Sequence, residues 1–309
     1  MRCSTDPAAF APAASTAHTT PRTTRHRLPS REAVPVSTIP VVLLPRGAEA
    51  ISPTGHYTGY VWVRHDLAPR ELATAEGRLL FHALEPAMRL GRLLGQPTFE
   101  GLLVARHRML DVLLAGAIER GEVGQVIEIA AGLSARGWRF TRRYDVTYVE
   151  ADLPRMASRK RELLERLGGG PRVTTVDALA DDGPDSIGAL ADTLDPSVGT
   201  AIVTEGLLNY FDREAVSGMW ARFADVLRRF PNGAYFADVV LRPGARSPAA
   251  RLGTELLQAL VRGRVHLHYE SELEAADALR EAGFPAAELS VAGTDDPGAR
   301  LVHVIDAWT

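Results

Sequence analysis

Two short apolar segments end in acidic residues and a glycine, with a spacing that suits the binding of a nucleoside. The first segment, Gln125–Ala130, contains Glu128 and continues into a turn of small residues around Gly132. The second segment, about twenty residues further on, ends with Glu150 and Asp152. A turn without bulky side chains lets a ligand lie against the backbone, and a carboxylate after the next strand can accept both ribose hydroxyls. These residues therefore predict a site for a nucleoside-containing cofactor.

Other acidic residues follow further apolar segments of the chain. Asp177, with its neighbour Ala178, follows a third segment and is placed to reach the amino group of an adenine ring. Glu205 follows the segment A-I-V-T, and its carboxylate could attract a positively charged group of the cofactor. Glu150 and Asp152 lie two residues apart and share one side of an extended strand, so one of them is expected to bind the ribose. The alternative is structural: a tight turn, a solvated strand end and a loop aspartate.

The elements that must position these residues alternate between strand and helix from Gln125 onward. This alternation predicts an α/β fold with a Rossmann-like, doubly wound sheet of seven strands that is mostly parallel and closes with an antiparallel hairpin. Strands are expected at 125–130, 145–150, 172–176, 199–204, 233–240, 286–292 and 300–307. Helices are expected at 154–167, 213–230 and 271–282, and an inserted helix at 244–264.

Capping residues indicate where two of these helices begin. Asp212 can cap the helix at 213–230, and Ser271 with Glu274 forms a capping box for the helix that ends at Gly283. The sequence P-N-G at 231–233 ends the first of these helices. Its apolar stripe is expected to comprise Val216, Met219, Trp220, Phe223, Val226, Leu227 and Phe230.

The region before the first strand, residues 41–124, is predicted to be a helical cap or lid. Leucines at helical spacing predict two apolar faces, formed by Leu72, Leu79, Leu80, Leu84 and Met88 and by Leu102, Leu103, Leu110, Leu113 and Leu114. The segment Ser52–His65 is rich in aromatic and hydrogen-bonding groups. His56, Tyr57 and Tyr60 are expected to line a lid over an acceptor substrate, and the alternative is a self-packed N-terminal strand.

The first forty residues differ from the rest. They are rich in Ala, Pro, Ser and Thr and contain five arginines, Arg2, Arg22, Arg25, Arg27 and Arg31. We interpret residues 1–40 as a disordered tail or an upstream extension, although an acid-poor, arginine-rich start is also typical of an organelle transit peptide. The cofactor-binding domain is then residues 125–309.

Composition excludes several function classes. The chain has 309 residues, a formal net charge of -3 and a single cysteine, Cys3. The charge gives no basic field for nucleic acid, and one cysteine excludes an internal disulfide and a cysteine-based metal site. No apolar run has membrane-spanning length. His266 and His268 could face the same way, but a third ligand is not apparent and no metal is expected. We expect a cytoplasmic protein whose partner is a small molecule; the sequence does not encode an oligomeric state.

Six motifs in order carry a family resemblance over residues 55–309. They are A-R-H-R-M-L-D (105–111), E-I-A-A-G-L-S-A-R (128–136), Y-V-E-A-D-L-P (148–154) with Lys160 following, V-D-A-L (176–179), T-E-G-L-L-N-Y-F (204–211) and E-A-G-F (281–284). The chain resembles class I S-adenosylmethionine-dependent methyltransferases, within them the leucine carboxyl methyltransferase-like group and its bacterial relatives linked to polyketide O-methylation. One departure is Ser134, because the family usually has G-L-D-T-R where this chain has G-L-S-A-R.

The resemblance implies roles for individual residues and an S-adenosylmethionine cofactor. It implies that Asp152 is the ribose acid, that Arg106 faces both the cofactor carboxylate and the substrate, and that Tyr210 lies near the substrate carboxylate. A guanidinium suits a carboxylate because its fork offers two parallel donors; Arg108 is the alternative to Arg106. For Tyr210 the alternative is a packed aromatic residue at a helix entry.

The implied activity is O-methylation of a small-molecule carboxylate or hydroxyl. A carboxylate acceptor is ionised at neutral pH and needs no general base, whereas a hydroxyl acceptor needs one, with His56, Tyr57 and His268 as candidates. Two rival classes share parts of this pattern. A nicotinamide-dependent oxidoreductase should show G-x-G-x-x-G after the first strand, where this chain has A-G-L-S-A-R-G. A catalytically silent binding protein should lack Gly132 or the ribose acid, and both are present.

Overall fold

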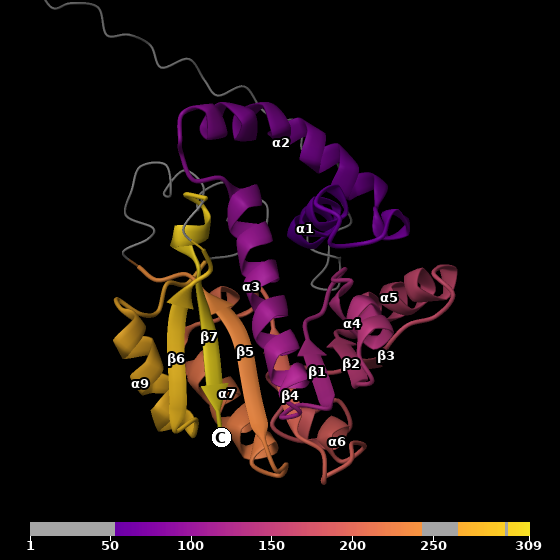
Figure 1. Cartoon of the computed structure of the whole chain (residues 1–309), viewed down its shortest axis with the longest axis vertical. Helices are drawn as coiled ribbons and strands as arrows, with labels where there is room; N and C mark the ends of the chain where they lie inside the picture. The colour runs from indigo at the N-terminus through magenta and orange to yellow at the C-terminus, as the bar shows by residue number, and fades with distance from the viewer. Residues whose placement is uncertain (1–52, 243–264, 294–295) are drawn as a thin grey trace, which may run out of the picture. The chain divides into compact units, whose positions relative to one another are not determined.

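The centre of the protein is a seven-stranded mixed sheet (Figure 1). The computed structural model describes residues 53–242, 265–293 and 296–309. The strands are β1 (Gln125–Ile129), β2 (Thr147–Asp152), β3 (Arg172–Thr175), β4 (Thr200–Thr204), β5 (Gly233–Val239), β6 (Ala286–Val291) and β7 (His303–Trp308). Their order in the sheet is β3-β2-β1-β4-β5-β7-β6. The first five strands are parallel, and β7 is antiparallel to both β5 and β6. The predicted fold class and terminal hairpin are confirmed.

The strand register aligns the carboxyl ends that matter for the site. Ile129, the last residue of β1, is paired with Ala151 of β2 on one side and with Thr204 of β4 on the other. The strand order reverses direction between β1 and β4, and ligands of open α/β sheets bind beyond the carboxyl ends of the strands at such a switch point. The residues that follow β1, β2 and β4 therefore meet at one edge of the sheet.

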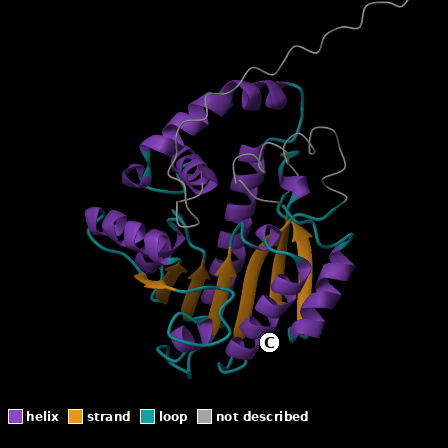
Figure 2. Ribbon diagram, turned by 180° about the vertical axis from the view of Figure 1, so that it is seen from behind, coloured by secondary structure: helices purple, strands orange, loops and turns teal. Residues whose placement is uncertain are grey.

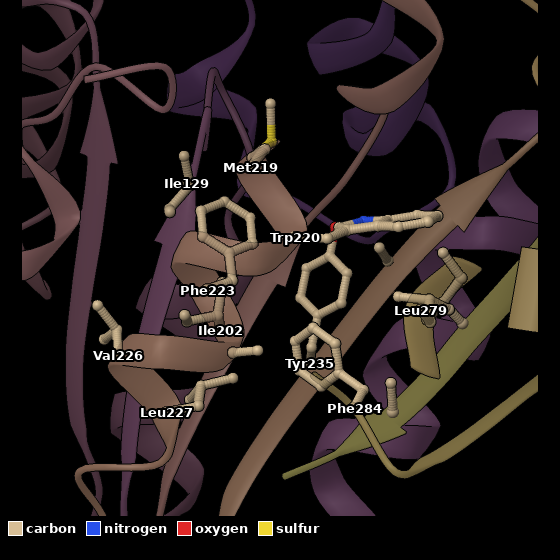
Figure 3. Packing of buried hydrophobic residues seen from close by; sticks show 14 of the residues in the cluster. Ile129, Ile202, Met219, Trp220, Phe223, Val226, Leu227, Tyr235, Leu279 and Phe284 are labelled. Carbon is tan, nitrogen blue, oxygen red and sulfur yellow. The ribbon is translucent and has the colours of Figure 1, made fainter. Parts of the chain in front are cut away.

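Helices cover both faces of the sheet, as the opposite views of Figures 1 and 2 show. In the described part of the chain, the α-helices that follow β1 are α4 (Arg136–Arg143), α5 (Pro154–Arg166), α6 (Ile187–Ala191), α7 (Arg213–Leu227) and α9 (Glu272–Ala282). Side chains alternate along each strand, so Ile202 packs with α6, α7 and α9, whereas Ala201 and Val203 face the side of the core that includes α4. Figure 3 shows the first of these layers, where Trp220 and Phe223 pack against Tyr235 and Phe284.

The predicted capping residues of α7 and α9 lie where the sequence indicated. The Asp212 carboxylate accepts a hydrogen bond from the Ala215 N–H at 2.9 Å, and the Ser271 hydroxyl accepts one from the Glu274 N–H at 3.1 Å. The Glu274 side chain bonds back to the N–H of Glu270 rather than to that of Ser271. The predicted apolar stripe of α7 is buried over its whole length, Phe230 included.

The region before β1 is helical, as predicted, but differs in detail. It contains α1 (Pro53–Arg64), the 3-10 helix η1 (Arg70–Leu72), α2 (Ala75–Leu93) and α3 (Phe99–Glu119). The alternative of an N-terminal strand in Ser52–His65 is wrong, because residues 53–64 form α1. The predicted leucine face of α2 is also wrong in part: Leu79 is 56% exposed, and Gly77 and Phe81 are the buried residues of this helix. A Cβ at Gly77 would lie 2.2 Å from the His56 carbonyl oxygen, so α1 packs directly onto that face.

The described helices before β1 belong to the same compact unit as the sheet, Arg46–Thr309. The predicted tail at 1–40 and the inserted helix at 244–264 lie outside the described residues, and the boundary between cap and sheet domain at 124/125 stays a prediction. Across the described ranges, no helix combines the length and the apolar character that crossing a membrane requires.

Candidate active site at the carboxyl edge of the sheet

The turn after β1 is held directly by the acid at the end of β2. Ala130 and Gly132 both have positive φ values, 55° and 52°. The Gly132 N–H donates a hydrogen bond to Asp152 Oδ2 at 2.8 Å, and Asp152 Oδ1 accepts one from the Leu153 N–H at 2.8 Å. A Cβ added at Gly132 would meet one atom within 4 Å, the Ala130 carbonyl oxygen at 3.9 Å. With respect to the described residues, the turn thus has open space on that side, where a ligand can approach the backbone.

Asp152 and Glu150 are in different environments although they are two residues apart. Burial raises the pKa of Asp152 above its usual range, while its hydrogen bonds from Gly132 and Leu153 act in the opposite direction. Glu150 is fully buried and forms an ion pair with Lys160 of α5 at 2.9 Å. Burial raises the pKa of Glu150 to about 7. Of the two carboxylates predicted for the ribose, Asp152 is the one that contacts the turn.

Glu128 is buried in β1, with both of its carboxylate oxygens engaged. Its Oε1 accepts a hydrogen bond from Arg136 Nη1 at 2.6 Å, and its Oε2 accepts one from the Tyr148 hydroxyl at 2.8 Å. Arg136 is the first residue of α4, and its own N–H donates to the hydroxyl of Ser134 at 3.1 Å. Glu128 therefore fixes the start of α4 against β1, and Ser134 supports the same helix start.

Glu205 lies at the centre of a buried group of charges. Its carboxylate accepts hydrogen bonds from Arg106 Nε at 3.1 Å, from His107 Nδ1 at 2.7 Å and from Arg136 Nη2 at 2.7 Å. Burial by itself would raise the pKa of Glu205, but His107, Arg136 and Arg106 together hold it well below its usual range. The residue predicted to attract a cationic group of the cofactor is thus already surrounded by donors from the protein.

Arg106 and Tyr210 come together beside Glu205. Besides Glu205, Arg106 contacts the buried carboxylate of Asp238 through Nη1 at 3.3 Å, and the other Asp238 oxygen accepts a hydrogen bond from the Gly206 N–H at 2.5 Å. Burial raises the pKa of Tyr210, and the nearby Arg106 acts against that shift. The structure therefore brings Arg106, Glu205 and Tyr210 to one place and adds Asp238, which the sequence reasoning missed.

His107 was also missed. Arg139 Nη2 lies 2.9 Å from His107 Nε2, and the Nδ1 atom faces Glu205. Arg136 Nη2 also lies 3.0 Å from His107 Nδ1, so the ring lies among Glu205 and two guanidinium groups. A sequence signal existed, since His107 and Asp111 are four residues apart on α3 and therefore share one helix face; Asp111 binds Arg136 Nε at 2.7 Å.

The residues predicted to contact the acceptor have contacts within the N-terminal helices. Tyr57 is buried and stacks on Phe81 and Phe99, with ring centroids 6.1 and 5.6 Å apart. Tyr60 meets Phe81 edge-on at 5.3 Å, and His56 Nδ1 lies 2.9 Å from the Thr74 hydroxyl. Their contact with a substrate stays a prediction.

The remaining candidates lie on loops. Asp177 is exposed, and its carboxylate accepts a hydrogen bond from the Leu179 N–H at 2.9 Å; Ala178 is half-buried. His266 and His268 do face the same way, with stacked rings 6.2 Å apart, and His268 Nε2 donates to the Phe211 carbonyl at 2.6 Å. Among the described residues there is no group of three or more metal-ligating side chains.

A family model connects this geometry to known proteins. The model described as leucine carboxyl methyltransferase matches residues 63–224, more than half of the chain. The chain belongs to the leucine carboxyl methyltransferase family. The matched range includes Arg106, the turn at Gly132, Asp152 and Glu205, and it confirms the family resemblance inferred from the six motifs.

Curated relatives carry matching names. A protein of Mycolicibacterium gilvum, provisionally named an S-adenosyl-L-methionine-dependent methyltransferase, is 37% identical over 122 residues, which are 39% of each chain. A protein of Mycobacteroides abscessus with the same name is 27% identical over 182 residues, or 57% of this chain and 53% of the relative. The matches thus span between about two fifths and about half of the length of these relatives. The cofactor in their names is the one that the sequence predicted.

Solved structures support the fold. A protein of Thermobifida fusca, provisionally titled a methyltransferase, aligns with a TM-score of 0.58 and 13% identity over 83% of this chain and 94% of its own. A family DUF574 protein of Streptomyces avermitilis aligns with a TM-score of 0.55 and 15% identity over 82% of this chain and 96% of its own. At such identities the likeness is evidence for the fold alone.

Proposed function

We propose that this chain is an S-adenosylmethionine-dependent O-methyltransferase that acts on a carboxylate or hydroxyl of a small molecule. The observation that carries the proposal is the hydrogen bond between Gly132 and Asp152, which places an open backbone turn and a carboxylate side by side at the switch point of the sheet. This arrangement suits a ligand that combines a ribose with a flexible polar chain. Family membership supplies the methyltransferase class.

The residues present fit the cofactor. Asp152 would accept hydrogen bonds from the ribose hydroxyls, the methionine portion would lie along Gly132, and Asp177 with Ala178 would contact the adenine. Arg106 would hold the cofactor carboxylate, because its guanidinium lies at the same edge of the sheet beside Glu205. When bound, S-adenosylmethionine supplies a methyl group that its sulfonium already activates toward nucleophiles. The protein's task is then to align the acceptor and to exclude water.

The acceptor side is assigned to Arg106 and Tyr210. A cationic guanidinium beside a half-buried tyrosine would orient a carboxylate acceptor, which needs no proton removed at neutral pH. A hydroxyl acceptor would need a base. His268 fits that role in one respect, since burial lowers its pKa and so favours the neutral ring. Its Nε2 is engaged with Phe211, which leaves Nδ1 as the proton-accepting atom.

Calorimetric titration of the purified chain with S-adenosylmethionine, S-adenosylhomocysteine and NAD tests the cofactor. We expect the first two to bind and NAD not to bind; NAD binding alone would favour an oxidoreductase, and no binding at all would favour a silent protein of this fold. As a matched pair, Asp152→Asn should weaken binding, whereas substitution of the exposed Asp225 by Asn should not.

Methyl transfer from radiolabelled S-adenosylmethionine tests the acceptor class. Small carboxylic acids and phenols should be compared between pH 6 and 8. With a carboxylate acceptor we expect a methylation rate that changes little over this pH range, because neither the acceptor nor the enzyme has to lose a proton. A rate that rises with pH and falls in His268→Gln would assign the acceptor to the hydroxyls instead. Transfer to an amine alone would contradict O-methylation.

A further inference from the structure

The side chain of Lys160 in α5 points into the protein and contacts the turn after β1 on the side that faces α5. Its side chain is 2% exposed. The Nζ atom donates to the carbonyl oxygen of Gly132 at 3.3 Å and to that of Ser134, and it forms the ion pair with Glu150 at 2.9 Å. An ammonium group has three N–H donors. Two of these donors are thus used by main-chain carbonyl oxygens, and the Glu150 carboxylate lies beside the same ammonium as its counter-ion.

The contacts fix the orientation of two peptide groups in the turn. The C=O and N–H of a trans peptide point in opposite directions. Because Lys160 draws the carbonyls of Gly132 and Ser134 toward α5, the N–H groups of Leu133 and Ala135 point away from α5. On the preceding peptide, the Gly132 N–H is held by Asp152 at 2.8 Å. Successive peptides of the turn are thus held from two sides.

Filling space would not require a charge at this position. The other buried side chains of α5 are Ala157, Leu163 and Leu164, and an apolar residue would pack there without the large cost of burying an ammonium and a carboxylate. The ammonium is matched instead to main-chain oxygens of the segment that is predicted to touch the cofactor. A buried ion pair thus contacts, and holds the conformation of, a turn that is predicted to bind a ligand.

We propose that Lys160 is a positioning residue for the cofactor: it acts through the backbone of residues 132–135, whose conformation it holds open for the methionine portion of the ligand. The inference rests on the proposed function for the identity of that ligand. Glu150 is the counter-ion that offsets the cost of burying the ammonium group. Its role is therefore to support the turn and not to bind the ribose. Asp152 and Lys160 then act on opposite sides of Gly132.

The test uses the full chain with Lys160→Met combined with Glu150→Gln, which removes both charges and leaves no uncompensated buried ion. The matched control is Arg166→Met, at an exposed position of the same helix. We expect the double variant to keep its circular dichroism spectrum and to bind S-adenosylhomocysteine about ten-fold or more weakly in calorimetric titration. The control should bind like the wild type. If the double variant does not fold, Lys160→Gln, whose amide keeps two N–H donors, replaces Lys160→Met beside Glu150→Gln.

Amide hydrogen exchange separates this inference from the proposed function. Without ligand, exchange in residues 131–135 should be faster in the double variant than in the wild type and unchanged in Arg166→Met. Wild-type affinity together with wild-type exchange in the folded double variant would overturn the proposal, as would an equal loss of affinity in the control. If the wild type itself binds no S-adenosylhomocysteine, the proposed function fails, and unchanged exchange would then overturn the role of Lys160 independently.

Discussion

Gly132→Ala should separate the stability of the turn from its ability to bind a cofactor. Gly132 has φ of 52°, where an L-residue costs about 1–2 kcal/mol, and the lower entropy of the unfolded alanine chain returns about 0.4–1 kcal/mol. The new Cβ would meet no atom of the residues that the structure describes closer than 3.9 Å. The expected loss of about 1 kcal/mol corresponds to a decrease in Tm of about 2–4 °C for a domain of this size.

The binding of S-adenosylhomocysteine should be affected far more than folding. If the cofactor lies against the open side of Gly132, the methyl group takes its place, and we expect the Kd to rise by about ten-fold or more, since overpacking costs about 1–3 kcal/mol. Gly95→Ala is the matched control, with φ of 64° and no atom within 4 Å of the added Cβ. Both variants should lose similar stability in thermal unfolding. Equal Kd values for Gly132→Ala and wild type would refute the placement of the cofactor at this turn.

Three further substitutions test the charges around the site. Asp152→Asn should raise the Kd for S-adenosylhomocysteine about ten-fold and also lower the Tm, because the amide loses the charge and keeps an acceptor oxygen for only one of the two backbone N–H groups; an unchanged Kd would exclude Asp152 as the ribose acid. Glu205→Gln should lower the free energy of unfolding in urea by about 1–3 kcal/mol, since it removes one charged acceptor from Arg106 and Arg136, which keep their other carboxylates, and an unchanged free energy of unfolding would contradict the structure. Burial raises the pKa of Glu150 to about 7 from 4.5, so the folded state binds more protons and stability should fall as pH rises between these values. Glu150→Gln should remove this component, which unfolding midpoints at pH 5, 6 and 7 can detect.

The order of strands and helices was predictable because it depends on local pattern. Strands β1, β4 and β5 are short, fully buried runs between turn residues. The helices α7 and α9 are capped by Asp212 and Ser271, whose side chains bond to the N–H three residues further on. The turn at Gly132 followed from the same kind of local signal. Such features depend on neighbours in sequence, so a single chain is enough to find them.

The partners of the charged residues could not be predicted in this way. Glu205 binds Arg106 across 99 residues and Arg136 across 69 residues of chain. Nothing local distinguishes a glutamate that will face a ligand from one that will face two arginines. The prediction of the buried face of α2 was wrong for a related reason. The leucine spacing predicted that Leu79 is buried, but α1 packs against the side with Gly77 and Phe81.

These pairings decide which of the predicted acids can bind a ligand without losing an ion pair. Displacing Glu150 from Lys160 would leave a buried cation uncompensated at a cost of about 3–5 kcal/mol. Displacing Glu205 would take from Arg136 one of its three carboxylate partners. Asp152 takes part in no ion pair with the described residues and accepts hydrogen bonds from two backbone N–H groups. A carboxylate has about four acceptor positions, so Asp152 can keep both bonds and still accept two hydroxyls. This asymmetry supports Asp152 as the ribose acid and gives the paired carboxylates the separate task of holding the turn and α4 in place.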